Sequence, residues 1–158
     1  MFIGHFGVAL AARRLAPRTS LATLIAASQT LDILWPAFLL VGLEHCRVAP
    51  GITRVQPLDF YDYPFTHGLV MAVFWALLFA LIYHLVRKYA AGALVVGGLI
   101  ISHWFLDWVV HRPDLPLLWN GGLKSWIGFV EFVGGIDFSR VIPVLCRHLD
   151  IPSLDPCA

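Results

Sequence analysis

Charged residues are scarce in this chain: Asp, Glu, Lys and Arg make up 13% of its 158 residues, whereas hydrophobic residues make up 59%. Average soluble domains are about one quarter charged and about half apolar. The scarcity of charge therefore argues against a soluble domain and favours a protein embedded in a membrane. The formal net charge is only +1 and no basic run exceeds two residues, so nothing indicates a nucleic-acid partner.

Cysteine is also rare, with three residues and no C-x-x-C spacing. An odd number of cysteines without such spacing implies neither a disulfide framework nor a zinc knuckle. We do not expect the N-terminal stretch to be a cleavable signal sequence, because Arg13 and Arg14 follow the first apolar stretch instead of preceding it. We therefore expect one mature domain over residues 1–122 and a tail of partial helix and coil over 123–158.

Long apolar stretches dominate what remains. A helix needs about 20 residues to cross the ~30 Å hydrocarbon core, and three stretches are long enough: 20–43, with a kink expected at Pro36, 66–86, with Thr66 as its cap, and 90–111. Shorter or more polar segments are a helix over 2–16, an extramembrane loop over 44–65 and an interfacial or partial helix over 123–146. These patterns predict an all-α integral membrane bundle of about four or five helices.

The orientation follows from the basic residues, which gather on the cytoplasmic side of membrane proteins. The arginines at 13, 14, 18 and 87 and Lys88 fall on one side if the spans alternate. We expect that side to face the cytoplasm of a bacterial inner membrane. Several ionisable residues of the helices then lie at one depth, in the outer half.

The segment ISHWFLDWVVHRPD, residues 101–114, carries His103, Asp107 and His111 at steps of four. At 100° per residue these side chains share one helix stripe. An ionisable residue near the centre of a membrane helix costs about 2.5–3.5 kcal/mol, so it needs compensation. Imidazole and carboxylate together are the usual ligands of zinc and similar divalent metals. The stripe therefore indicates a metal site.

The spacing says more about that site. His103 and His111 are separated by about 12 Å along the helix axis, too far to share one ion without distortion. We expect Asp107 to bridge two ions about 3.5–4 Å apart, each bound by its nearer histidine. Further ligands could come from neighbouring helices, namely His5, Asp32 and His67.

Such a metal pair would lower the pKa of a bound water and hold the oxygens of a phosphoester. Asp114 could act as a general base or support a ligand, and Arg112 could steer a phosphate. Less specific interpretations stand beside these. A single intramembrane histidine is more often a hydrogen-bonded packing residue than a ligand, and Arg112 and Asp114 are of a type common where helices end.

Two other functions remain open. The same ionisable residues could form a metal or proton pathway of a transporter, although the inner half of the spans offers only His84 for such a path. The loop 44–65, with its mixture of Tyr, Asp and Arg, could instead make the chain a membrane-anchored interaction module.

Four motifs resemble a known family: Gly4-His5, Asp32 followed by Trp35-Pro36, Thr66-His67-Gly68, and the block from Ser102 to Asp114. They resemble the inner-membrane-associated, metal-dependent hydrolases, some of them described as LexA-binding, which are distantly similar to bacterial zinc-dependent phospholipase C. The resemblance covers roughly residues 1–122 and implies an all-helical metallohydrolase that cleaves phosphoesters at the membrane. We expect the substrate to be a phospholipid or a lipid phosphate.

In this family the metal ligands would be His5, Asp32, His67, His103, Asp107 and His111. The implied cofactor is a divalent metal, zinc or else manganese, as one or two ions. The family continues with another hydrophobic helix after the matched region, and residues 123–158 depart from that pattern.

Overall fold

The computed structural model describes residues 2–49, 51, 58–110, 115–118 and 124–125. Within this part the chain is mainly helical, with two small antiparallel sheets. The helices are α1 (Phe2–Ala12), α2 (Leu21–Ser28), α3 (Thr30–Leu40), α4 (Pro64–His67), α5 (Leu69–Arg87) and α6 (Ala90–Val110). The strands are β1 (His45–Val48), β2 (Leu58–Asp62), β3 (Leu115–Pro116) and β4 (Lys124–Ser125).

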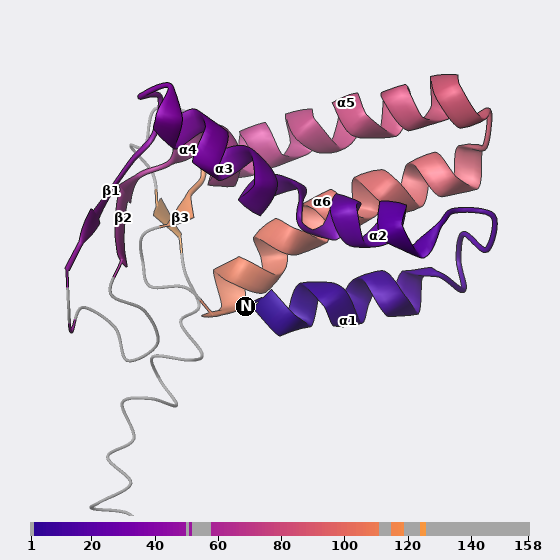
Figure 1. Ribbon diagram of the computed structural model, residues 1–158, viewed down its shortest axis with the longest axis horizontal. Helices are drawn as coiled ribbons and strands as arrows, with labels where there is room; N and C mark the ends of the chain where they lie inside the picture. Colours follow the sequence, from indigo (N-terminus) through magenta and orange to yellow (C-terminus); the bar gives the residue numbers. More distant parts are fainter. Residues whose placement is uncertain (1, 50, 52–57, 111–114, 119–123, 126–158) are drawn as a thin grey trace, which may run out of the picture.

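Two described helices, α5 with 19 residues and α6 with 21, are long and apolar enough to cross a membrane. They form an antiparallel pair that turns at Lys88, whose backbone is left-handed with φ 49° (Figure 1). Only 11% of the apolar window of α5 is buried within the protein, so most of its side chains face outward. An apolar helix with exposed sides is stable in lipid and not in water. The two helices indicate association with a membrane.

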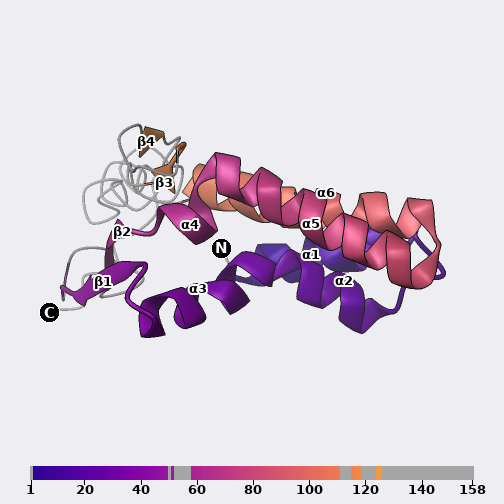
Figure 2. The same ribbon diagram turned by 90° about the horizontal axis from the view of Figure 1, so that it is seen from above.

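Helix α6 is the central element, in contact with α1, α2, α3 and α5 (Figure 2). Small residues let it approach α5: a Cβ on Gly97 would lie 3.3 Å from both the Ala76 carbonyl oxygen and the Ala80 Cβ. A Cβ on Gly98 would meet nothing within 4 Å. Close contact between the two helices is therefore present at Gly97 and absent at Gly98.

The predicted span 20–43 is broken into α2 and α3, which meet at an angle of 54°. The break lies at Gln29, whereas the expected kink position, Pro36, lies inside α3. Ser28 Oγ donates to the Ile25 carbonyl at 2.9 Å and Thr30 Oγ1 donates to the Ala26 carbonyl at 3.0 Å. Hydroxyls that bond carbonyls of the preceding turn bend helices, which accounts for the position of the break. If α2 and α3 are one broken span, the described spans number three.

The predicted extramembrane loop 44–65 contains an antiparallel hairpin, in which His45 pairs with Asp62 and Val48 with Leu58. Strands β3 and β4 form a second small sheet. The described fold is therefore mainly helical but not all-α. Its two or three candidate spans do not by themselves establish the expected bundle of four or five membrane helices. Of the partial helix expected over 123–146, only Lys124 and Ser125 lie among the described residues, and they form β4.

The expected cap at Thr66 is also wrong. Thr66 belongs to the short helix α4, and α5 begins after Gly68, which provides no side-chain cap. A Cβ on Gly68 would overlap the carbonyl oxygen of Pro64. Only glycine lets the chain turn this tightly from α4 into α5, and the turn fixes His67 at the end of α4.

Candidate metal centre

Five of the predicted ligands come together from four helices: His5 on α1, Asp32 on α3, His67 on α4, and both His103 and Asp107 on α6. Two groups of three offer ligand atoms that all lie within 4.8 Å of one another, namely His5, His103 and Asp107, and Asp32, His67 and His103. The N-terminal end of α1 lies beside the C-terminal half of α6 in Figure 1, which brings His5 to the group.

His103 is held in one orientation by a backbone carbonyl. Its Nδ1 lies 2.7 Å from the carbonyl oxygen of Ser28, and a carbonyl can only accept, so Nδ1 carries the proton and donates. Ser28 ends α2, where the last carbonyls of a helix run out of intrahelical partners. The break between α2 and α3 thus supplies the acceptor that orients this imidazole.

The other nitrogen of His103 faces two carboxylates. Nε2 lies 3.2 Å from Asp107 Oδ2 and 3.5 Å from Asp32 Oδ1. It is buried and has no hydrogen bond of acceptable geometry to any described residue. A buried nitrogen that points at two carboxylate oxygens without bonding either one is the arrangement expected of a metal ligand, whose second nitrogen is typically held by a carbonyl or carboxylate.

His67 is oriented by a chain of hydrogen bonds. Its Nδ1 lies 2.8 Å from Thr66 Oγ1, and that hydroxyl donates to Glu44 Oε2 at 2.8 Å. The backbone N–H of Thr66 donates to Glu44 Oε1 at 2.7 Å. Because the single hydroxyl proton of Thr66 goes to Glu44, its oxygen accepts from His67 Nδ1–H. His67 Nε2 is thereby left facing Asp32 Oδ1 at 3.5 Å and Asp107 Oδ2 at 4.0 Å.

Glu44 accepts the last bonds of this series of hydrogen bonds, and it is almost completely buried, with 1% of its surface exposed. Burial raises the pKa of the Glu44 carboxyl above its ordinary value, while the two hydrogen bonds from Thr66 oppose that shift. The sequence analysis missed this residue. It lies 22 positions before Thr66, in a segment read as an extramembrane loop, and no spacing rule links the two.

Asp107 lies between the remaining histidines. Its Oδ1 is 3.3 Å from His5 Nε2, and its Oδ2 faces His103 and His67. The ring of His5 stacks on that of His103, with centroids 3.9 Å apart and planes inclined by 6°. Both oxygens of the carboxylate thus have an imidazole nitrogen opposite them.

A divalent ion fits this geometry. Around a tetrahedral ion with bonds of about 2.0–2.1 Å, neighbouring ligand atoms are about 3.3 Å apart. The measured separations from His103 Nε2 to Asp107 Oδ2 and Asp32 Oδ1 are 3.2 and 3.5 Å. The four helices that carry the candidate ligands contain no lysine or arginine that could offset the two carboxylates. A 2+ charge would offset them.

The number of ions depends on His103. It belongs to both groups of three, but only its Nε2 is directed into the site, and one nitrogen binds one ion. The two groups therefore cannot hold two ions at the same time with three protein ligands each. The bridge expected between His103 and His111 stays a prediction, because His111, Arg112 and Asp114 lie outside the described residues.

Access to the group is from the side of Asp32. The side chain of Asp32 is 40% exposed, whereas those of His5, His103 and Asp107 are 4% exposed or less. Catalytic zinc sites typically use three protein ligands and leave one position open. The group of Asp32, His67 and His103 has this form, with its one open edge at the carboxylate.

Comparison with known proteins gives no family: no family model, no curated protein and no solved structure matches the chain.

Proposed function

We propose that the chain is a membrane-embedded, metal-dependent hydrolase of phosphoesters, such as a phospholipid or a lipid phosphate. One observation carries the proposal: three histidines and two aspartates from four helices face one another within 4.8 Å in two overlapping groups, and two of the histidines have their second nitrogen hydrogen-bonded elsewhere. Intramembrane ionisable residues are costly, so such a group points to a function.

In this proposal Asp32, His67 and His103 hold the metal, zinc or else manganese, and the half-exposed edge at Asp32 admits the substrate. A divalent ion bound there would make a nearby water acidic near neutral pH and would stabilise negative charge on a phosphoryl oxygen. His5 keeps the carboxylate of Asp107 in place through the contact of 3.3 Å between His5 Nε2 and Oδ1.

Asp107 is the proposed proton acceptor, since its Oδ2 lies 3.2 Å from His103 Nε2, beside the metal position. The oxygen of water bonds to phosphorus, its proton passes to Asp107, and the bond between phosphorus and the departing oxygen breaks. The departing oxygen then takes the proton from Asp107, so the step balances without another reagent. Arg112 keeps the role proposed from the sequence, steering the phosphate, and Asp114 is the alternative proton acceptor to Asp107.

The distribution of ionisable residues favours a localised site over a transport pathway. Between Leu69 and Tyr83 on α5, and between Ala90 and Ser102 on α6, there is no Asp, Glu, His, Lys or Arg. A proton or metal relay across the membrane would need groups along this length. The buried anchor Glu44 also ties part of the 44–65 segment to the site, which favours a supporting role for it over an independent interaction module.

The proposal is tested with the full chain in detergent, using bis(p-nitrophenyl) phosphate and a diacyl phosphatidic acid as substrates. We expect hydrolysis of at least one substrate that EDTA abolishes and zinc or manganese restores. His103→Ala should lower the rate by about a hundredfold or more, because it removes a ligand. His84→Ala, at the far end of α5, is the matched control and should retain activity. No metal-dependent hydrolysis of either ester, or equal rates in His103→Ala and wild type, would refute the proposal.

A further inference from the structure

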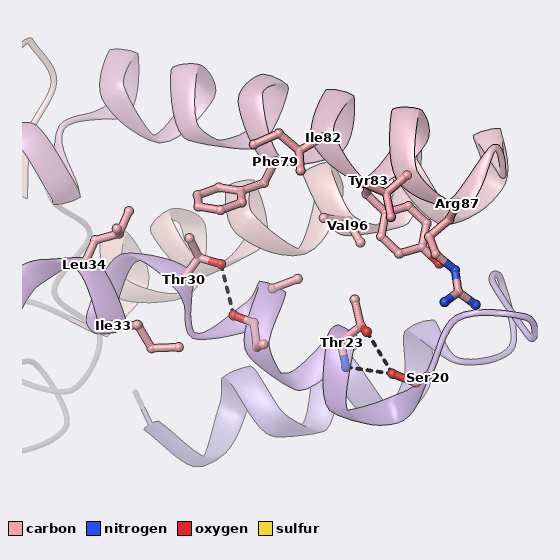
Figure 3. Close-up of a pocket in the computed structure, with 13 residues that line it drawn as sticks. Ser20, Thr23, Thr30, Ile33, Leu34, Phe79, Ile82, Tyr83, Arg87 and Val96 are labelled. Carbon is pink, nitrogen blue, oxygen red and sulfur yellow. Dashed lines mark hydrogen bonds between the residues drawn. The ribbon is translucent and has the colours of Figure 1, made fainter.

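A groove of about 460 Å³ runs between α2–α3 on one side and α5 on the other, apart from the candidate metal ligands (Figure 3). None of the five converging ligands lines it. Its volume lies within the range of about 300–1,000 Å³ that is typical of small-molecule sites. The groove has two chemically different parts, one along its length and one at its end.

The length of the groove is apolar. Ala26, Ile33, Phe79, Ile82 and Val96 are among the residues that line it, and they come from α2, α3, α5 and α6. Ile33 and Ile82 are 60% and 46% exposed, so the groove is open toward the side of the protein. Because α5 is a candidate membrane span, this open side would face the acyl chains of the bilayer.

The end of the groove is polar and basic. Ser20, Thr23, Tyr83 and Arg87 line it, and in Figure 3 they gather at one end, near the start of α2 and the end of α5. Ser20 Oγ lies 2.8 Å from Thr23 Oγ1 and accepts from the Thr23 backbone N–H at 3.1 Å. Arg87 forms no ion pair with any described residue, so its charge is available to a ligand.

The charge around this end has one sign. The connections α1–α2 and α5–α6 lie at the same end of the molecule in Figures 1 and 2. These connections and the ends of their helices carry five cations, namely Arg13, Arg14, Arg18, Arg87 and Lys88. Residues 1–31 and 63–106 contain no Asp or Glu at all. An anionic group at the end of the groove would therefore be attracted by several cations, and these two segments contribute no carboxylate that would repel it.

We propose that the groove binds one anionic phospholipid, with its phosphate at Ser20, Thr23 and Arg87 and an acyl chain along Phe79 and Ile82. A polar, cationic end joined to an apolar trough matches a molecule that has an anionic head and a hydrocarbon tail. The site does not depend on the proposed hydrolase activity, because it shares no residue with the metal centre.

The test is native mass spectrometry of the purified full chain, incubated with equimolar dioleoyl phosphatidylglycerol and dioleoyl phosphatidylcholine. We expect one phosphatidylglycerol to be retained in preference to phosphatidylcholine. Arg87→Gln should lower this preference about fivefold, the effect of one cation on an anionic lipid. Arg87→Lys should preserve most of it. Arg47→Gln, which removes a cation of β1 at the opposite end of the protein in Figure 1, is the control and should change it less than twofold.

A second variant tests the trough. Ala26→Phe should reduce retention of both lipids, because the ring would occupy the apolar part of the groove, whereas Leu77→Phe on another face of α5 should not. Circular dichroism of every variant checks that the helices are intact. Equal retention of the two lipids by wild type, equal losses in Arg87→Gln and Arg47→Gln, or unchanged binding in a folded Ala26→Phe would each overturn the proposal.

Discussion

Thr66→Val tests the hydrogen-bond chain that orients His67. Valine has nearly the same shape as threonine but has no hydroxyl, so the substitution removes both the bond to Glu44 Oε2 and the bond from His67 Nδ1, each of 2.8 Å. The backbone bond from Thr66 N–H to Glu44 Oε1 remains. The carboxylate of Glu44 then loses its hydroxyl donor, and the imidazole of His67 loses its positioning contact.

The size of the effect follows from burial. Glu44, Thr66 and His67 are all buried, so the lost partners are not replaced by water. A hydrogen bond to a charged group contributes about 1.5–3 kcal/mol and one between neutral groups about 1 kcal/mol. We therefore expect the free energy of unfolding to fall by about 2.5–4 kcal/mol. Loss of an outer-shell partner of a metal-binding histidine typically weakens metal affinity about 10- to 100-fold, so zinc affinity should fall by that factor.

Thr66→Ser is the matched control, because it keeps the hydroxyl and loses only a methyl group, at about 1 kcal/mol. Zinc affinity is measured for both variants by competition with a chelator in detergent, and stability by thermal unfolding without metal. The argument requires Thr66→Val to bind zinc at least about tenfold more weakly than Thr66→Ser. Equal zinc affinities in the two variants would refute the idea that Thr66 positions His67.

Two further substitutions test the packing. Gly97→Leu should lower the thermal unfolding midpoint, with a cost of about 1–3 kcal/mol for overpacking against Ala76. Gly98→Leu should be neutral or stabilising, because a Cβ at that position meets nothing within 4 Å. Equal effects of the two substitutions would contradict the described α5–α6 contact. Arg47→Ala should change the free energy of unfolding by less than about 1 kcal/mol, and only at low salt. Its Nε lies 2.7 Å from Asp59 Oδ2, but the Arg47 side chain is 70% exposed, so water and salt screen the pair. A large, salt-independent loss in the same unfolding assay would show that the hairpin depends on this pair.

The spans and the shared stripe of the site could be predicted from local rules. The apolar length of residues 90–111 predicts a helix that the structure ends at Val110. The step of four between His103 and Asp107 predicts neighbouring side chains, and the atoms facing each other are 3.2 Å apart. Such features depend only on helix periodicity, so the sequence is sufficient for them.

The features that could not be predicted depend on competition or on distant contacts. Pro36 indicated a kink, but the break lies at Gln29. There the hydroxyls of Ser28 and Thr30 bond backbone carbonyls of the turn that precedes them. The hairpin strands are only four and five residues long, too short for a clear alternating pattern. Glu44 reaches the site through Thr66 by tertiary folding alone, and neither residue carries a local signal for this contact.

The metal content of the purified chain tests the central claim most directly. Inductively coupled plasma mass spectrometry of the wild type, reconstituted with zinc and separated from unbound metal, should give one or two zinc ions per chain. The double substitution His103→Ala/Asp107→Ala removes residues from both candidate groups and should reduce this to less than about a tenth, while His84→Ala should leave it unchanged. An equal zinc content in the wild type and the folded double variant would show that these residues do not form a metal site.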